Sequence, residues 1–278
     1  MSSDSEEEDL TNEALSNAAT SGDLALVQTV VERQKAQVHP SPLTPKHLQS
    51  AMAAAVSSHH PIIVSYLLDQ GAKVSPNNIV VALGEPDATI TMFQTFLNHG
   101  WDINSKTVLG NPVLKHVINN EPLTRFFLSR GADPNPTTNP GGTLLDVAAA
   151  NSTPATFSLL LAHGATLSNS DALHSAAGEL SKVPGRVEMM AYLLALGLDV
   201  NALWRREYPP SRRKGRGTPL HAAVSSQERD RIVLLLEKGA DARIKDTLER
   251  TPMEYAVEKG LERAVGVLRE YEDMRKVA

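Results

Sequence analysis

The side chains that could do chemistry in this sequence are its nine histidines and a set of turn carboxylates. His59 and His60 are adjacent, so a regular helix could not direct both toward one metal ion. Four aspartates each lie two residues after a glycine: Asp102, Asp133, Asp199 and Asp241. Aspartate at such a turn usually hydrogen-bonds the local backbone instead of acting as an acid or base.

Other catalytic patterns are missing from the sequence. It has no cysteine, no G-x-S-x-G nucleophile motif and no G-x-x-x-x-G-K-[ST] phosphate loop. We therefore expect a chain that is not an enzyme and that has neither a metal site nor a cofactor.

A glycine ends an apolar helical run six times along the chain, at Gly71, Gly100, Gly131, Gly164, Gly197 and Gly239. The gaps between these glycines are 29, 31, 33, 33 and 42 residues. Glycine suits the end of a helix because it enters the left-handed conformation without a Cβ penalty. A period near 33 residues predicts a stack of supersecondary units instead of a single globular core.

Composition fits such a stack. The chain has 41% hydrophobic but only 4% aromatic residues, so alanine and leucine must supply most of the packing. No apolar run approaches the roughly 20 residues that span a bilayer, and the acidic start predicts no signal peptide. Five of the 32 acids lie between Asp4 and Asp9, and the other 27 balance 27 Lys and Arg. A neutral body argues against direct nucleic-acid binding.

The pattern along the chain predicts three regions. Residues 1–11 are polar and acidic, so we expect a disordered tail. Helical pairs follow over 12–271, beginning with Asn12–Thr20 and Asp23–Arg33, and form about eight units. The last unit lacks a closing Gly-Ala-Asp, as expected of a capping repeat that meets water, and 272–278 form a charged end.

The segment Thr218-Pro219-Leu220-His221-Ala222-Ala223 matches T-P-L-H-x-A, the motif that opens an ankyrin repeat. Partial copies begin at Thr143, Asp171 and Thr251, and Gly131–Thr143 and Gly239–Thr251 both keep a spacing of twelve residues. The chain thus resembles the ankyrin-repeat family over 12–271. The resemblance implies an all-α solenoid of stacked helix-turn-helix units with projecting finger loops. It also implies structural roles for His174 and His221, because the motif histidine hydrogen-bonds within its own or the next repeat.

Two insertions interrupt the array. Leu180–Pro184 lengthens one helix-to-helix turn, and the distance from Gly197 to Thr218 is 21 residues instead of twelve. The second insertion, 202–217, lies in a finger loop and carries these basic and aromatic residues: Trp204, Arg205, Arg206, Tyr208, Arg212, Arg213, Lys214 and Arg216. Three interpretations stay open: a solvated loop, a partner contact rich in Trp, Tyr and Arg, or an import signal or phosphate-binding patch.

Mapping the repeat motif onto the chain predicts a partner-binding surface. It places Lys115, Val147, Ser175, Ala222 and Tyr255 on the concave wall made by the first helices. Trp101 and Lys106 lie near a finger tip with Val108 and Leu109, and Trp101 could instead cover a helix end.

We expect a non-enzymatic scaffold or adaptor that binds another protein through fingers and groove. The alternatives are a transcriptional coregulator that acts through a DNA-binding partner, and an assembly chaperone or subunit of an enzyme complex. In each case we expect a cytoplasmic or nuclear monomer that binds neither nucleic acid directly nor a membrane.

Overall fold

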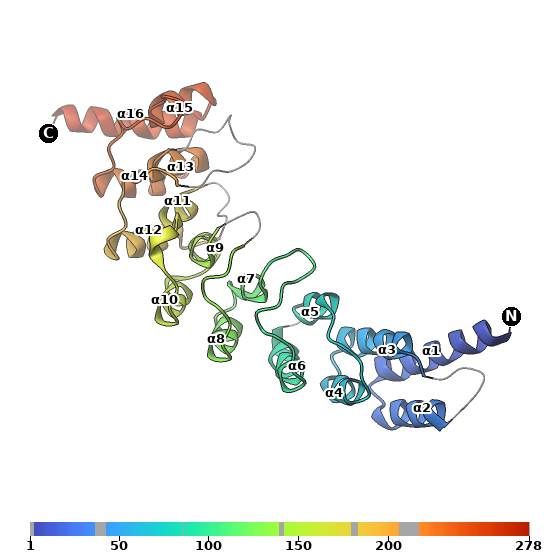
Figure 1. Ribbon diagram of the computed structural model, residues 1–278. Helices are drawn as coiled ribbons and strands as arrows, with labels where there is room; N and C mark the ends of the chain where they lie inside the picture. Colours follow the sequence, from blue (N-terminus) through green and yellow to red (C-terminus); the bar gives the residue numbers. More distant parts are fainter. Residues whose placement is uncertain are drawn as a thin grey trace. The chain divides into compact units, whose positions relative to one another are not determined.

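The computed structural model describes residues 3–36, 43–84, 86–138, 142–178, 183–205 and 217–277. Within these ranges the chain forms sixteen α-helices, one 3-10 helix and no β-strand (Figure 1). This confirms the predicted all-α class. The chain divides into two compact units, Met1–Val113 and Leu114–Ala278.

Unit 1 contains three helical pairs. Its helices are α1 (Ser3–Ser21), α2 (Leu24–Ala36), α3 (Pro45–Ser57), α4 (Pro61–Asp69), α5 (Pro76–Ala82) and α6 (Pro86–Asn98). The first helices of the pairs pack in one row (α1 on α3, α3 on α5), and the second helices pack in another (α2 on α4, α4 on α6). Leu15, Met52, Leu67 and Phe93 are fully buried between the rows. This is the layered arrangement of stacked helical repeats.

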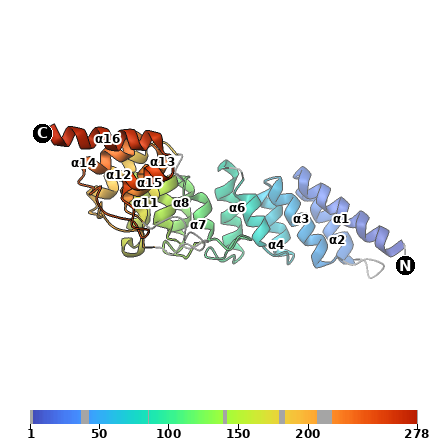
Figure 2. The ribbon, with the colours of Figure 1, turned by 90° about the horizontal axis from the view of Figure 1, so that it is seen from above.

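Unit 2 also contains two rows of helices. Its helices are α7 (Val113–Val117), α8 (Glu121–Ser129), α9 (Leu144–Asn151), α10 (Pro154–Ala162), α11 (Ala172–Ala177), α12 (Arg186–Ala195), α13 (Pro219–Ser226), α14 (Arg229–Glu237), α15 (Pro252–Glu258) and α16 (Glu262–Val277), with the 3-10 helix η1 at Leu167–Asn169. First helices α9, α11, α13 and α15 pack in sequence, as do second helices α8, α10, α12, α14 and α16. Figure 2 shows these helices from above.

Local sequence explains where the first helices begin. Thr44, Ser75, Thr143 and Thr251 each form a capping box, in which the cap side chain and the side chain three residues later satisfy each other's backbone N–H groups. Proline at the first helical position, as in the Thr-Pro pair of α15, has no N–H that would need a partner.

The repeating glycines end the second helices as predicted. Gly131 has a φ of +90°, and its N–H donates to the Leu128 carbonyl at 3.1 Å. The next N–H, that of Ala132, donates to the Phe127 carbonyl at 3.0 Å. Gly239 has the same φ of +90°. The left-handed residue turns the chain out of the helix toward the finger.

Two buried arginines, which sequence reasoning missed, cap first helices of unit 2. Arg231 on α14 donates to the carbonyls of Ala177 at 3.3 Å and Gly178 at 2.8 Å, where α11 ends. Arg186 on α12 donates to the carbonyls of Ala149 and Ser152, where α9 ends. The last carbonyls of a helix have no intrahelical donor, so each arginine satisfies groups that would otherwise be buried alone.

Both chain ends differ from expectation. Helix α1 begins at Ser3, so the expected disorder over 1–11 is wrong for Ser3 onward. Acidic residues near a helix N-terminus are favourable because they meet the positive end of the helix dipole. Helix α16 runs to Val277 and takes in the charged end expected at 272–278. The single repeat domain expected over 12–271 remains a prediction. No helix in the described ranges is long and apolar enough to span a membrane.

Replacing Arg231 by Met should lower the free energy of unfolding by about 2 kcal/mol, because two buried carbonyls lose a charged donor. The control is Arg229→Met on the same helix, where an exposed arginine pairs with Glu270. Urea unfolding followed by circular dichroism measures both variants. Equal midpoints for Arg231→Met and the wild type would contradict the capping role.

Candidate functional site

One backbone hydrogen bond closes each finger whose base is described in unit 2. The N–H of Asp246 donates to the Arg250 carbonyl at 2.8 Å, and the N–H of Thr138 donates to the Gly142 carbonyl at 3.2 Å. Each donor lies seven residues after its repeat glycine, and each acceptor lies four residues after the donor. The fingers therefore share one turn geometry.

The long insertion lies inside that turn. The N–H of Trp204, seven residues after Gly197, donates to the carbonyl of Gly217 at 3.0 Å. The acceptor lies thirteen residues after the donor instead of four, so the extra residues all fall between these two bonded ends in the sequence. Residues 206–216 lie outside the described ranges, and with them Arg206, Tyr208, Arg212, Arg213, Lys214 and Arg216. Their roles stay predictions.

The base of the insertion packs on the motif histidine His174. The ring of Trp204, which is half-buried, lies with its centroid 5.2 Å from that of His174. Nε2 of His174 donates to the carbonyls of Ala202 at 3.0 Å and Gly217 at 3.2 Å. Burial, above all, lowers the pKa of His174 to about 4, so the ring is neutral at pH 7. The predicted structural role of His174 is confirmed.

A missing finger lies next to the insertion. Asp171, which precedes α11, lies only seven residues after Gly164, whereas Thr143 and Thr251 each lie twelve residues after their repeat glycines. Arg205 contacts this shortened segment: its N–H donates to Asp171 Oδ1 at 3.2 Å, and its guanidinium donates to the Ser168 carbonyl. Trp204 and Arg205 therefore anchor the base of the insertion. The short spacing from Gly164 to Asp171 was the signal in the sequence that could have indicated this contact.

Asparagine side chains link neighbouring fingers in unit 2. Asn201 donates from Nδ2 to the Gly239 carbonyl at 3.3 Å, and its Oδ1 accepts the Asp241 N–H at 2.8 Å. Asn135 makes the same two kinds of contact to the segment that begins at Gly164. These bonds fix the spacing of successive finger bases.

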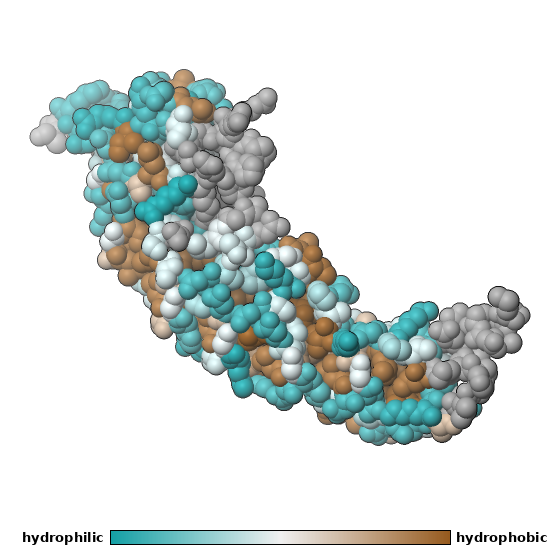
Figure 3. Space-filling view, viewed as in Figure 1, coloured by the Kyte–Doolittle hydropathy of each residue, from teal (hydrophilic) through white to brown (hydrophobic). Residues whose placement is uncertain are grey.

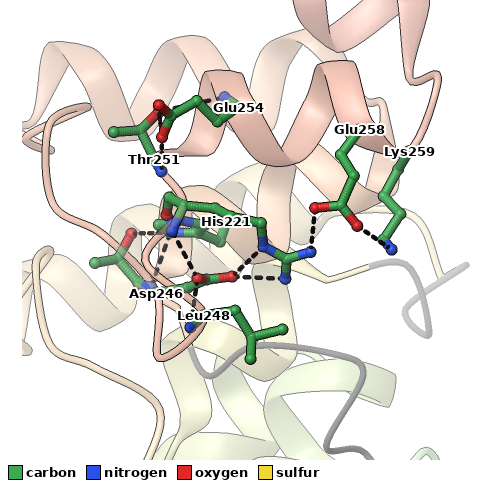
Figure 4. Close-up of polar contacts among 9 residues, drawn as sticks. His221, Asp246, Leu248, Thr251, Glu254, Glu258 and Lys259 are labelled. Atoms are coloured by element: carbon green, nitrogen blue, oxygen red, sulfur yellow. Dashed lines mark hydrogen bonds and ion pairs between the residues drawn. The ribbon is translucent and has the colours of Figure 1, made fainter.

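The last finger is held by a buried ion pair (Figure 4). The guanidinium of Arg250 contacts Asp246 Oδ2 at 2.7 Å, and the Asp246 side chain is 1% exposed. Asp246 Oδ1 also accepts the N–H groups of Leu248 at 2.8 Å and Arg250 at 3.0 Å. Burial alone would raise the pKa of Asp246, but the hydrogen bonds from Arg250 and Leu248 hold it below its ordinary value.

The same arginine positions an aromatic residue of the first-helix row. Its guanidinium lies 5.0 Å from the centroid of the Tyr255 ring, and Tyr255 lies 6.3 Å from the ring of His221. His221 accepts the Thr218 N–H at Nδ1 (3.1 Å) and donates from Nε2 to the Arg250 carbonyl at 3.0 Å. Its predicted structural role is therefore confirmed.

The repeat that contains His221 and Asp246 matches a known family. A family model for the ankyrin repeat matches residues 217–247, which include α13, α14 and the start of the last finger. Residues 217–247 are an ankyrin repeat. No curated protein matches the chain. The total of about eight ankyrin repeats remains a prediction.

The predicted wall residues all lie on successive first helices. Lys115, Val147, Ser175 and Tyr255 are half-buried on α7, α9, α11 and α15, and Ala222 on α13 is 8% exposed. Burial lowers the pKa of Lys115. That these residues share one side of unit 2 is what the resemblance to ankyrin repeats implies, and of the five only Ala222 lies within the matched repeat. Their role in binding stays a prediction.

The finger that follows Gly100 belongs to unit 1. Its turn has the same closure, from the Thr107 N–H to the Asn111 carbonyl at 2.9 Å. Val108 and Leu109 at its tip are 60% and 64% exposed, and Lys106 is also exposed.

Trp101 packs on the helix before this finger. Its ring lies 5.5 Å from that of Phe93 and 6.3 Å from that of Phe96, both on α6. These contacts support the interpretation that it covers a helix end. A partner contact through its exposed part remains a prediction.

The turn aspartates make the local bonds that were predicted. Each accepts through Oδ1 the N–H two residues on, at 2.8–2.9 Å: Asp102, Asp133, Asp199 and Asp241. His60 contacts the Thr20 carbonyl at 3.0 Å through Nε2. Among the described residues, no three His, Asp or Glu side chains are placed to hold a metal ion.

One Ser, His and Asp cluster in unit 1 has the composition of a catalytic triad but not its geometry. His99 Nε2 lies 3.4 Å from Ser65 Oγ and 3.2 Å from Asp69 Oδ1, and Nδ1 lies 2.8 Å from the Thr95 carbonyl. A triad needs the carboxylate on one ring nitrogen and the serine on the other. Here both compete for Nε2, so the carboxylate cannot orient the ring for attack by serine.

Acid should destabilise the fold through His174. The unfolded chain binds a proton near pH 6.5 and the folded chain near pH 4, so stability should fall as pH drops across that window, by up to about 3 kcal/mol. His221, whose pKa burial also lowers, acts in the same direction. Urea midpoints at pH 7.5 and pH 5 measure the slope. His174→Gln should reduce it, whereas the exposed His163→Gln should not; unchanged slopes in both would refute the assignment.

Breaking the buried ion pair with Arg250→Met should lower the free energy of unfolding by about 3 kcal/mol, because Asp246 keeps a buried charge without its partner. The matched control is Arg243→Met, since Arg243 is 90% exposed in its pair with Asp241. We expect no measurable change there, by thermal or urea unfolding. A loss of similar size in the two variants would show that burial does not matter.

Proposed function

We propose that the chain is a non-enzymatic scaffold that binds another protein through the first-helix face and fingers of unit 2. Ankyrin repeats generally mediate protein–protein interaction, and the matched repeat lies within this unit. The observation that carries the proposal is a recurring pair: an aromatic residue packed on a motif histidine, Trp204 on His174 and Tyr255 on His221.

This pairing suits an interface. Tryptophan, tyrosine and arginine dominate the energetics of protein interfaces. Side chains that are already held in place lose little entropy when a partner binds. Tyr255 is held by Arg250 and His221, and Trp204 by His174, so both present a half-buried ring in a fixed orientation. The neutral body of the sequence favours a protein partner over nucleic acid.

A second candidate is a transcriptional coregulator that enters the nucleus and acts through a DNA-binding partner. The basic residues of the insertion support it, because short Lys/Arg clusters can act as import signals. A fluorescent fusion tests this: nuclear signal that is lost when Arg212, Arg213 and Lys214 become Ala supports the coregulator. Cytoplasmic signal in both forms removes the argument.

A third candidate is an assembly chaperone or a subunit of an enzyme complex. Purification of the full chain with its partners distinguishes this candidate from the other two. A stoichiometric enzyme complex would favour it. The scaffold itself is proposed to be a monomer in the cytoplasm, the nucleus or both, with no membrane contact.

Tyr255→Ala should weaken binding to a captured partner by at least about fivefold, or about 1 kcal/mol, if this ring anchors the interface. The partner is first obtained by affinity purification and mass spectrometry, and its Kd is then measured by titration calorimetry. Tyr192→Ala is the matched control, because Tyr192 is a half-buried tyrosine on second helix α12. Circular dichroism checks that both variants fold. If Tyr255→Ala binds the partner no more weakly than Tyr192→Ala does, Tyr255 does not anchor the interface.

A further inference from the structure

The second-helix face of unit 1 carries an open groove that the proposed function does not use. The groove has a volume of about 390 Å³, and it is lined by Leu24 of α2, by Pro61, Ile62, Ser65, Tyr66 and Asp69 of α4, and by Thr91 and Thr95 of α6. Ile62 is 69% exposed. Figure 3 shows hydrophobic patches interrupting the hydrophilic surface in one view of the molecule.

The fold does not require an apolar residue where Ile62 lies. Ile62 is nine residues before its repeat glycine, Gly71. The other second helices that end at a repeat glycine carry small, polar or charged residues at the same position: Thr91, Pro122, Ala155, Glu188 and Asp230. Burying an isoleucine side chain stabilises a fold by about 2 kcal/mol, and an isoleucine that is left mostly exposed contributes little of this stabilisation. The residue therefore suits something that covers it.

Charge indicates what could cover it. Helices α4 and α6 contain no lysine or arginine, and Asp69 lies in the groove wall. The pKa of Tyr66 is raised, first by burial and second by the negative charge of the nearby Glu32. Lys35 of α2 pairs with Glu32 at 3.3 Å. Unit 1 as a whole has twelve Asp and Glu against five Lys and Arg.

We propose that this groove binds an amphipathic helix of a partner protein, with an apolar face and basic flanks. An apolar stripe with side chains at i, i+3, i+4 and i+7 fits a shallow groove between helices. Basic flanks complement the acidic wall and select against acidic helices. The groove is formed by second helices of unit 1, whereas the surface proposed above is formed by first helices and fingers of unit 2, so either proposal can fail alone.

Two synthetic helical peptides of about 16 residues test the proposal, since two heptads cover such a groove. Both carry leucine at i, i+3, i+4 and i+7; one has lysine and arginine at the remaining positions and the other has glutamate. Fluorescence anisotropy measures their Kd for the full chain. We expect the basic peptide to bind at least about tenfold more tightly than the acidic one.

Substitutions then locate the binding. Ile62→Thr introduces the residue that α6 carries at the same position, so folding should be kept. The substitution should raise the Kd of the basic peptide by about tenfold or more. The control is Val80→Thr on first helix α5 of the same unit, where Val80 is 38% exposed; its Kd should match the wild type.

Four outcomes would overturn the proposal. The first is no binding of the basic peptide, and the second is equal binding of both peptides. The third is an Ile62→Thr variant that binds like the wild type, which would place the peptide elsewhere on the acidic unit. Self-association of the chain that Ile62→Thr abolishes, measured by analytical ultracentrifugation, would assign the groove to a second copy and also overturn the proposal.

Discussion

The hydrogen bond from a motif histidine to a backbone carbonyl of the next finger is the interaction on which unit 2 depends. His221 reaches the Arg250 carbonyl, and His174 reaches those of Ala202 and Gly217. A repeat buries too little surface to fold alone, so contacts to its neighbour decide both stability and spacing. The bond requires a proton on Nε2, and in His221 the other nitrogen, Nδ1, must be unprotonated because it accepts the Thr218 N–H. Burial favours the neutral ring by lowering the pKa of both histidines.

This constraint explains how a finger can grow without disturbing the stack. The Trp204–Gly217 hydrogen bond closes the long finger as the Asp246–Arg250 bond closes the short one. His174 holds both ends of the insertion base, because Ala202 and Gly217 flank it. The tip is then free to vary in length and charge while the scaffold stays the same. Variation of loops on a rigid support is a common origin of specificity in binding proteins.

Much of the fold could be predicted because its signals are local. The glycine period gave the helix ends, and Thr218-Pro219 and its copies gave the helix starts. What was missed depends on distant contacts. Nothing in the sequence distinguishes Arg231 from Arg229 on the same helix, and only packing shows that Arg231 caps α11. Of the candidate site, the sequence could place Tyr255 on a first helix, but not its contacts with Arg250 and His221.

Hydrogen–deuterium exchange of the full chain with and without its captured partner tests the central claim most directly. The account predicts that the partner protects α13, α15 and the finger from Gly239 to Thr251 in unit 2, and leaves second helices α10, α12 and α14 unchanged. Protection confined to those second helices, or no protection anywhere in unit 2, would contradict a scaffold that binds through its first helices and fingers.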